Sequence, residues 1–282
     1  MMIWLILSIV FSTSLFLAFK LFGRFQVDLF SAIIVNYFTC FVLGNIYLGK
    51  NHLLQIETFE AQGFWPIVSM GSLFIGTFFL MGTATQKVGA SMSSMASKMS
   101  VVIPVFVAVL FFKETLHFQQ WIGILLSIFA VILISLKDEG GMHFDWILIL
   151  VFLGSGMVDT GLNLLKNAQY TFFDSVKMST LLFAGAFICG LFLILIQPKL
   201  IAHLNLKSSI GGFLLGTANF LSLVVMFEGI AAFDGKTSLF FTINNIGVVC
   251  ASAAVGVLMK EKLSKKGFIG LGLALMAIAL MM

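Results

Sequence analysis

Ten long apolar segments, separated by short polar breaks, constrain this chain more than any other feature of its sequence. A helix needs about 20 mostly apolar residues to cross the hydrocarbon core of a bilayer. Only 10% of the 282 residues are charged, whereas soluble domains carry roughly 25%. Too few charges are available for the polar shell of a soluble protein, so the sequence predicts an all-α integral membrane protein. The expected spans are residues 2–21, 28–48, 63–86, 91–112, 118–136, 145–165, 173–196, 210–232, 237–259 and 266–282.

An internal repeat divides these spans into two halves, 1–140 and 141–282. The motif Lys-Glu-x-Leu, followed after five residues by Ile-Gly, begins at Lys113 and again at Lys260. Each half then holds five spans, and because five is odd, the second half must cross the membrane in the opposite sense. Inverted-topology repeats of this kind are typical of secondary transporters, whose substrate site lies near the midplane between the halves. The alternative is that the duplication only reflects how the fold arose.

Ionisable side chains inside spans are costly, which makes Lys98 the sharpest candidate for a functional residue. It is the eighth residue of its span, about 12 Å along the helix, and shares a small polar face with Ser94 and Ser97. The ammonium could bind a substrate carboxylate or phosphate, or form a structural ion pair with a buried acid such as Asp159. Pro104 is expected to kink the same helix just beyond Lys98 and to free a backbone carbonyl there.

Asp159 lies near the middle of its own span, four residues before Asn163 and on the same helix face. A protonatable carboxylate facing a cavity could couple transport to proton flow, and a fixed partner of Lys98 is the alternative reading.

Several asparagines inside spans are further candidates for lining the substrate site. Asn245 occupies the position in the second half that Lys98 occupies in the first, and Asn244 precedes it. Asn36 and Asn219 also lie in mid-span. Each could contact substrate or join two helices by a hydrogen bond worth about 1 kcal/mol. Gly212 and Gly216 form a small-xxx-small pattern, which predicts close helix packing.

The stretch 103–123 resembles a signature of EamA-like proteins, which belong to the drug/metabolite transporter superfamily. That signature joins a Pro-Val-Phe run, here at Pro104, to a basic-Glu-x-Leu turn at Lys113 and a Gln-x-x-Gly helix opening at Gln120. The second half departs from it, with Ala251 and Gly267 in place of the proline and the glutamine.

The resemblance implies a ten-helix carrier of small metabolites or drugs, without naming a substrate. Glu114 and Glu261, in the repeated turns, are interpreted as structural residues that cap the next helix or pair locally. No metal or cofactor site is expected, and no phosphate-binding loop of the Walker type is present in the sequence.

The function expected from these features is secondary transport by alternating access, with efflux as one direction. Lys98 favours an amino acid or another solute bearing a carboxylate or phosphate. An integral membrane enzyme acting on lipid is the alternative, built on loop histidines with Glu57, Glu60 or Asp145. The expected partners are the bilayer and a small solute, not nucleic acid, and a homodimer is left open. The expected location is the plasma membrane, in a bacterium the inner membrane.

The orientation of the termini is left open, because two signals conflict. The loops opposite the termini carry more Lys and Arg than those on the same side, which by the positive-inside rule puts the termini outside. The family resemblance implies that they lie inside.

Overall fold

The computed structural model describes residues 2–49, 64–113, 115–136, 145–165, 172–197, 199, 205–233, 237–261 and 264–281. Over these residues the chain is helical and contains no β-strand, which confirms the all-α prediction. The helices are α1 (Met2–Phe25), α2 (Leu29–Leu48), α4 (Phe64–Lys87), α5 (Ala90–Met99), α6 (Val102–Phe112), α7 (Phe118–Ser135), α8 (Trp146–Leu165), α9 (Phe172–Ile196), α10 (Leu206–Ala232), α11 (Thr237–Leu258) and α12 (Lys265–Leu280).

Eight helical stretches of the described chain are long and apolar enough to cross a membrane, with α5 and α6 together forming one of them. Large apolar side chains cover much of the outer surface, among them Phe111, Leu195 and Leu258. Such a surface is stable in contact with lipid but not with water, so the chain is a multi-pass membrane protein. Helix α8 contains a shorter apolar stretch, Trp146–Leu162, and α12 has 16 residues.

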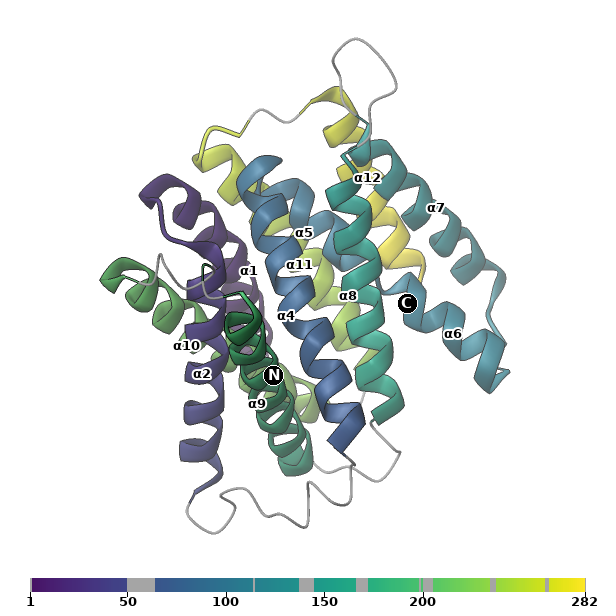
Figure 1. The fold of residues 1–282 in the computed structure, drawn as a ribbon. Helices are drawn as coiled ribbons and strands as arrows, with labels where there is room; N and C mark the ends of the chain where they lie inside the picture. The colour runs from purple at the N-terminus through teal and green to yellow at the C-terminus, as the bar shows by residue number, and fades with distance from the viewer. Residues whose placement is uncertain are drawn as a thin grey trace.

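The helices of the two halves interleave in one bundle (Figure 1). Helix α2 packs against α9 and α10, while α4 packs against α8 and α9. Helix α1 lies against α10 and α11. An aromatic core joins the halves, because the ring of Tyr37 lies 5.6 Å from that of Phe78 and 6.1 Å from that of Phe183.

Glycines bring α2 and α10 unusually close, as the small-xxx-small pattern predicts. A Cβ added to Gly216 would lie 2.7 Å from the backbone oxygen of Asn36, and one added to Gly212 would lie 2.5 Å from that of Ala32. The α4–α9 contact uses Gly71 in the same way, because a Cβ added there would collide with the backbone of Gly185 and Ala186.

The glycine of the repeated motif lies where the two halves meet, between α7 and α12. A Cβ on Gly123, near the start of α7, would lie 3.0 Å from the carbonyl oxygen of Ala277, near the end of α12. A Cβ on Gly270, near the start of α12, would lie 3.8 Å from the carbonyl oxygen of Ala130, the equivalent of Ala277, and would collide with Ile134, near the end of α7. Equivalent residues therefore make reciprocal contacts, and the two helices run antiparallel.

The expected span 91–112 is not one continuous helix, because the chain turns at Ser100 and Val101 between α5 and α6. Pro104 has no N–H to donate to the carbonyl of Ser100, four residues earlier, and its ring crowds that carbonyl. The kink expected beyond Lys98 is thus present. The freed carbonyl is not left open, however, because the Ile103 N–H donates to it over 2.9 Å.

Candidate functional site

A row of polar side chains joins α5 of the first half to α8 of the second. The Ser155 hydroxyl donates to Ser97 Oγ over 3.1 Å, and the Ser100 hydroxyl lies 3.5 Å from Asp159 Oδ2. Asp159 also interacts electrostatically with the Lys98 ammonium. These five residues, Ser97, Lys98, Ser100, Ser155 and Asp159, are called the α5–α8 polar seam below.

The residues of this seam differ in exposure, and Ser100 and Ser155 are buried. Ser94, one turn before Lys98, is fully buried, and its hydroxyl donates to the Ser91 carbonyl of its own helix. Ser97 and Lys98 are partly exposed, and Asp159 is exposed. Lys98 and Asp159 can therefore meet each other and a bound solute, whereas the Ser94 hydroxyl is turned into its own helix.

Asn36 and Asn219 meet at the α2–α10 interface, in a cluster separate from the seam. Asn219 Nδ2 donates to Asn36 Oδ1 over 3.2 Å, and the Cys40 thiol lies 3.3 Å from the carbonyl oxygen of Gly216. This geometry is that of an interhelical hydrogen bond. The Asn36 Nδ2 is buried and makes no hydrogen bond within the described part of the chain.

The remaining predicted site residues fall on α11 and α8. Asn244 and Asn245 are buried in α11, and no described group donates to Asn244 Oδ1. Asn163 belongs to α8, and its side chain lies outside the described residues. Of the eight candidates for substrate contact, Ser97 and Lys98 are thus the two that lie in the seam with Asp159. No group of three His, Cys, Asp or Glu side chains suited to a metal ion occurs among the described residues.

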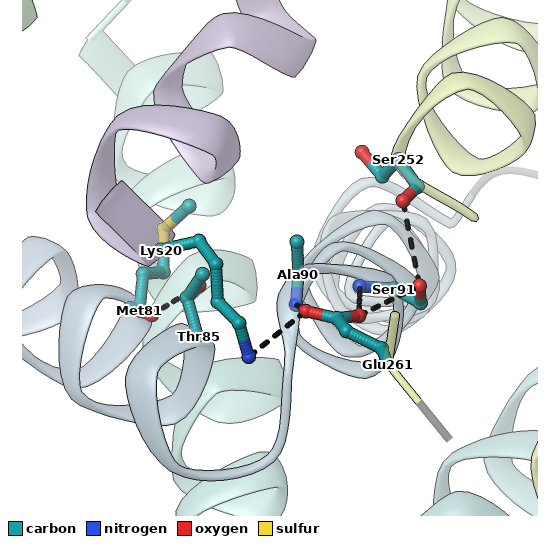
Figure 2. Close-up of polar contacts among 7 residues, drawn as sticks. All are labelled: Lys20, Met81, Thr85, Ala90, Ser91, Ser252 and Glu261. Carbon is teal, nitrogen blue, oxygen red and sulfur yellow. Dashed lines mark hydrogen bonds and ion pairs between the residues drawn. The ribbon is translucent and has the colours of Figure 1, made fainter. Parts of the chain in front are cut away.

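A second polar cluster gathers around Glu261, in the turn between α11 and α12 (Figure 2). Lys20 Nζ of α1 lies 3.0 Å from Glu261 Oε1, which also accepts the Ala90 N–H over 2.8 Å. Glu261 Oε2 accepts the Ser91 hydroxyl over 3.1 Å and lies 3.4 Å from the Ser91 nitrogen. The carboxylate thus caps the N-terminus of α5, where the helix dipole and the free N–H groups favour negative charge. Lys20, Ala90, Ser91 and Glu261 are called the Glu261 cluster below.

The backbone conformation at Lys260 and Glu261 positions the Glu261 side chain in this cluster. Lys260 adopts the left-handed conformation, with φ of 58°, and ends α11. The Glu261 N–H then turns back to the carbonyl of Gly256 over 2.8 Å. Lys113, the equivalent of Lys260 in the first half, has a φ of 55°, so both lysines of the repeated motif adopt the left-handed conformation.

The role assigned to Glu261 from the sequence needs a correction. The next helix, α12, is capped by Ser264, whose side chain accepts the Gly267 N–H over 3.1 Å. Glu261 instead caps α5 and pairs with Lys20, both in the other half of the chain. The repeated Lys-Glu pair was the available signal, but a single sequence cannot show which distant helix a turn meets. Glu114 lies outside the described residues.

Three comparisons with known proteins found similar sequences and a similar fold. An uncharacterised protein of Haemophilus influenzae is 28% identical, with 97% of this chain and 95% of the relative aligned. A solved crystal structure of a protein shares the fold, with a TM-score of 0.53 at 15% identity over 99% of this chain and 94% of that one. The model of the EamA-like transporter family matches residues 1–136.

The matched residues include α1 and α5, which hold Lys20 and Lys98, and the repeated turn at Lys113. The first half of the chain, residues 1–136, thus matches the EamA-like transporter family, in agreement with the resemblance to the drug/metabolite transporter superfamily seen in its sequence.

Proposed function

We propose that this protein is a secondary carrier that moves a small metabolite or drug across the membrane by alternating access. The observation that carries the proposal is the α5–α8 polar seam, where Lys98 of the first half interacts with Asp159 of the second. Charged groups inside membrane helices are expensive and mark substrate or ion pathways. A solute held there would touch both halves, and a shift of one half against the other would move its access from one side to the other.

The chemistry of the seam favours a solute with a carboxylate or phosphate. Lys98 supplies three N–H donors, and the Ser97 hydroxyl, which accepts from Ser155, supplies one more. The buried Ser100 hydroxyl donates to the Ser97 carbonyl instead. Asp159 gives the site an acceptor for an amine or a proton. An amino acid fits both charges, and Asp159 is the proposed group for proton coupling. Asn36, Asn163, Asn219, Asn244, Asn245 and Ser94 remain candidates for further contacts.

The fold supports an arrangement of ten spans in two inverted halves. The reciprocal contacts of Gly123 and Gly270 are those of two helices related by a two-fold axis across the bundle. Helices α8 and α12, added to the eight long spans, would bring the number to ten. We place the protein in the plasma membrane, in a bacterium the inner membrane.

A thermal-shift screen of the purified protein tests the proposal. Amino acids, sugar phosphates, nucleosides and cationic drugs are added to the wild type, to Lys98→Met and to Lys265→Met, which removes an exposed lysine at the start of α12. We expect an anionic or zwitterionic solute to stabilise the wild type and Lys265→Met, but not Lys98→Met. Equal stabilisation of all three would reduce Lys98 to a structural partner of Asp159.

Flux then separates a carrier from other membrane proteins. Proteoliposomes loaded with the solute found in the screen should exchange it with labelled solute outside, at a rate that Lys98→Met lowers at least tenfold. A lipid-modifying enzyme would give no exchange, and that result would reject the carrier.

A further inference from the structure

We infer that the Glu261 cluster is a gate, and that it holds one end of the carrier closed in this structure. The closed end is the one where α1, α4 and α11 finish and α5 begins, opposite the chain termini. The inference rests on the proposed transport function, but its test needs no substrate. It assigns Lys20 and Glu261 to the conformational step rather than to solute binding.

The contacts of the cluster all cross between the two halves. Glu261 belongs to the second half, whereas its three partners, Lys20, Ala90 and Ser91, belong to the first. Its side chain is only 8% exposed. Hydrogen bonds to a charged group are about twice as strong as neutral ones. A movement that separates α5 from the α11–α12 turn must break them together.

The two serines next to the Glu261 carboxylate, Ser91 and Ser252, are buried. Ser91 is 1% exposed and Ser252 of α11 is 0% exposed, and the Ser91 hydroxyl lies 3.4 Å from the Ser252 carbonyl oxygen. Lys98, two turns further along α5, is partly exposed, so the closure lies on one side of the α5–α8 polar seam. A solute at the seam could not leave past Ser91 and Ser252 without separating α5 from α11.

Two glycines make room for the carboxylate, so its position is built into the fold. A Cβ on Gly89, which has a φ of 111°, would lie 2.7 Å from Glu261 Cδ. A Cβ on Gly256 would lie 2.6 Å from Glu261 Oε2 and collide with Ser91 Oγ. In the first half, Val109 stands in place of Gly256 at the same distance before the repeated Lys-Glu pair.

The cluster is also suited to reversible release. The Ala90 and Ser91 donors lie at the N-terminus of α5, where water can replace the lost partner once α5 moves away. The ammonium of Lys20 can reach solvent, since it is already 24% exposed. Closed and open states can therefore differ by a small free energy, which a carrier requires in order to populate both.

The test is the labelling rate of a cysteine placed behind the gate. Ser252→Cys is nearly isosteric, and the Ser252 hydroxyl makes no hydrogen bond among the described residues. Detergent-purified protein is treated with a charged maleimide, and protein without the added cysteine gives the background from Cys40, Cys189 and Cys250. We expect Glu261→Gln and Lys20→Met to raise the rate about tenfold, as expected for loss of a charge-assisted hydrogen bond. Lys20→Arg should stay close to the wild-type rate.

Two controls separate gate opening from general loosening. Ser127→Cys in α7 is equally buried and its hydroxyl is equally without a described partner, so it reports on the bundle away from the gate. Its rate should not change with Glu261→Gln. Glu114→Gln, in the equivalent turn of the sequence, should not speed labelling at position 252. Gly256→Ala keeps every charge and should open the gate by collision with Ser91 and Glu261.

An unchanged rate at position 252 in Glu261→Gln, Lys20→Met and Gly256→Ala would overturn the gate. Faster labelling at both reporter positions would also overturn it, because Glu261 would then only stabilise the fold. A wrong proposal of transport would give a different result. The gate variants would then speed labelling at position 252, but the wild type would exchange no solute.

Discussion

At the scale of single residues, polar side chains inside the bundle have two different surroundings. Asn36 and Asn219 share one hydrogen bond across a packed interface. Lys98 and Asp159 interact across another, and both keep part of their surface exposed. A carrier needs both kinds, because fixed pairs hold helices together and accessible charges are free to exchange partners with a solute.

The Asn36–Asn219 hydrogen bond should contribute modestly to stability. We expect a coupling free energy of about 0.6 kcal/mol, the average for such pairs between membrane helices. Unfolding free energies of Asn36→Ala, Asn219→Ala and the double variant, measured in mixed micelles with sodium dodecyl sulfate, give this value from a double-mutant cycle. Strictly additive losses would mean that the bond contributes nothing beyond packing.

Asp159 should matter for coupling more than for folding. Removing its charge with Asp159→Asn should lower proton-driven accumulation of the solute at least tenfold, because no carboxylate remains to carry the proton. Exchange of labelled for unlabelled solute should persist, since it needs no net proton movement. Both are measured in proteoliposomes with an imposed pH gradient. Accumulation at the wild-type level would remove Asp159 from the coupling step.

The sequence alone can mark a residue as a candidate when the reason lies within its own helix, and the role of Lys98 stays a prediction of this kind. Lys98 was recognisable because a lysine in mid-span is costly wherever the helix packs. Glu261 was misinterpreted because its function depends on α5, about 170 residues earlier in the chain. No periodicity or cap signal near Glu261 encodes that contact.

At the scale of elements, apolar runs predicted the helices well and their continuity less well. The run 91–112 predicts one span, and the two helices α5 and α6 do cover it. The turn at Ser100 depends on Pro104, whose effect on the backbone is local and could be foreseen. The hydrogen bond from the Ile103 N–H to the Ser100 carbonyl could not be foreseen, because it depends on how far the chain bends.

The close contact between α2 and α10 gives a sharp prediction about glycine. Gly216→Ala places a Cβ against the backbone of Asn36, which cannot move aside cheaply, so we expect a loss of about 1–3 kcal/mol. Gly76→Ala is the matched control, since nothing lies within 4 Å of its added Cβ. Thermal unfolding should show a lower Tm for Gly216→Ala and an unchanged Tm for Gly76→Ala. Equal Tm values would mean that α2 and α10 are not this close.

At the scale of the whole molecule, the packing of α7 against α12 restricts the topology. Gly123 near the start of α7 meets Ala277 near the end of α12, so the two helices are antiparallel. An even number of crossings must then separate them. Helices α9, α10 and α11 are each long and apolar enough to cross. We therefore expect α8 to supply the fourth crossing, although its apolar stretch, Trp146–Leu162, is short.

Cysteines on either side of α8 and α12 test this arrangement. Glu139→Cys and Gln169→Cys flank α8 in the sequence, and Lys265→Cys and a cysteine added after Met282 flank α12. Each pair should react with an impermeant maleimide from opposite faces of the membrane, compared in intact cells and inverted vesicles. Helix α12 is about 24 Å long, against roughly 30 Å of hydrocarbon, so the bilayer must thin or the flanking lysines must extend to reach water. Labelling of the α8 pair from one face would make α7 and α12 parallel and contradict their packing. Labelling of the α12 pair from one face would leave nine crossings and place the two termini on opposite sides.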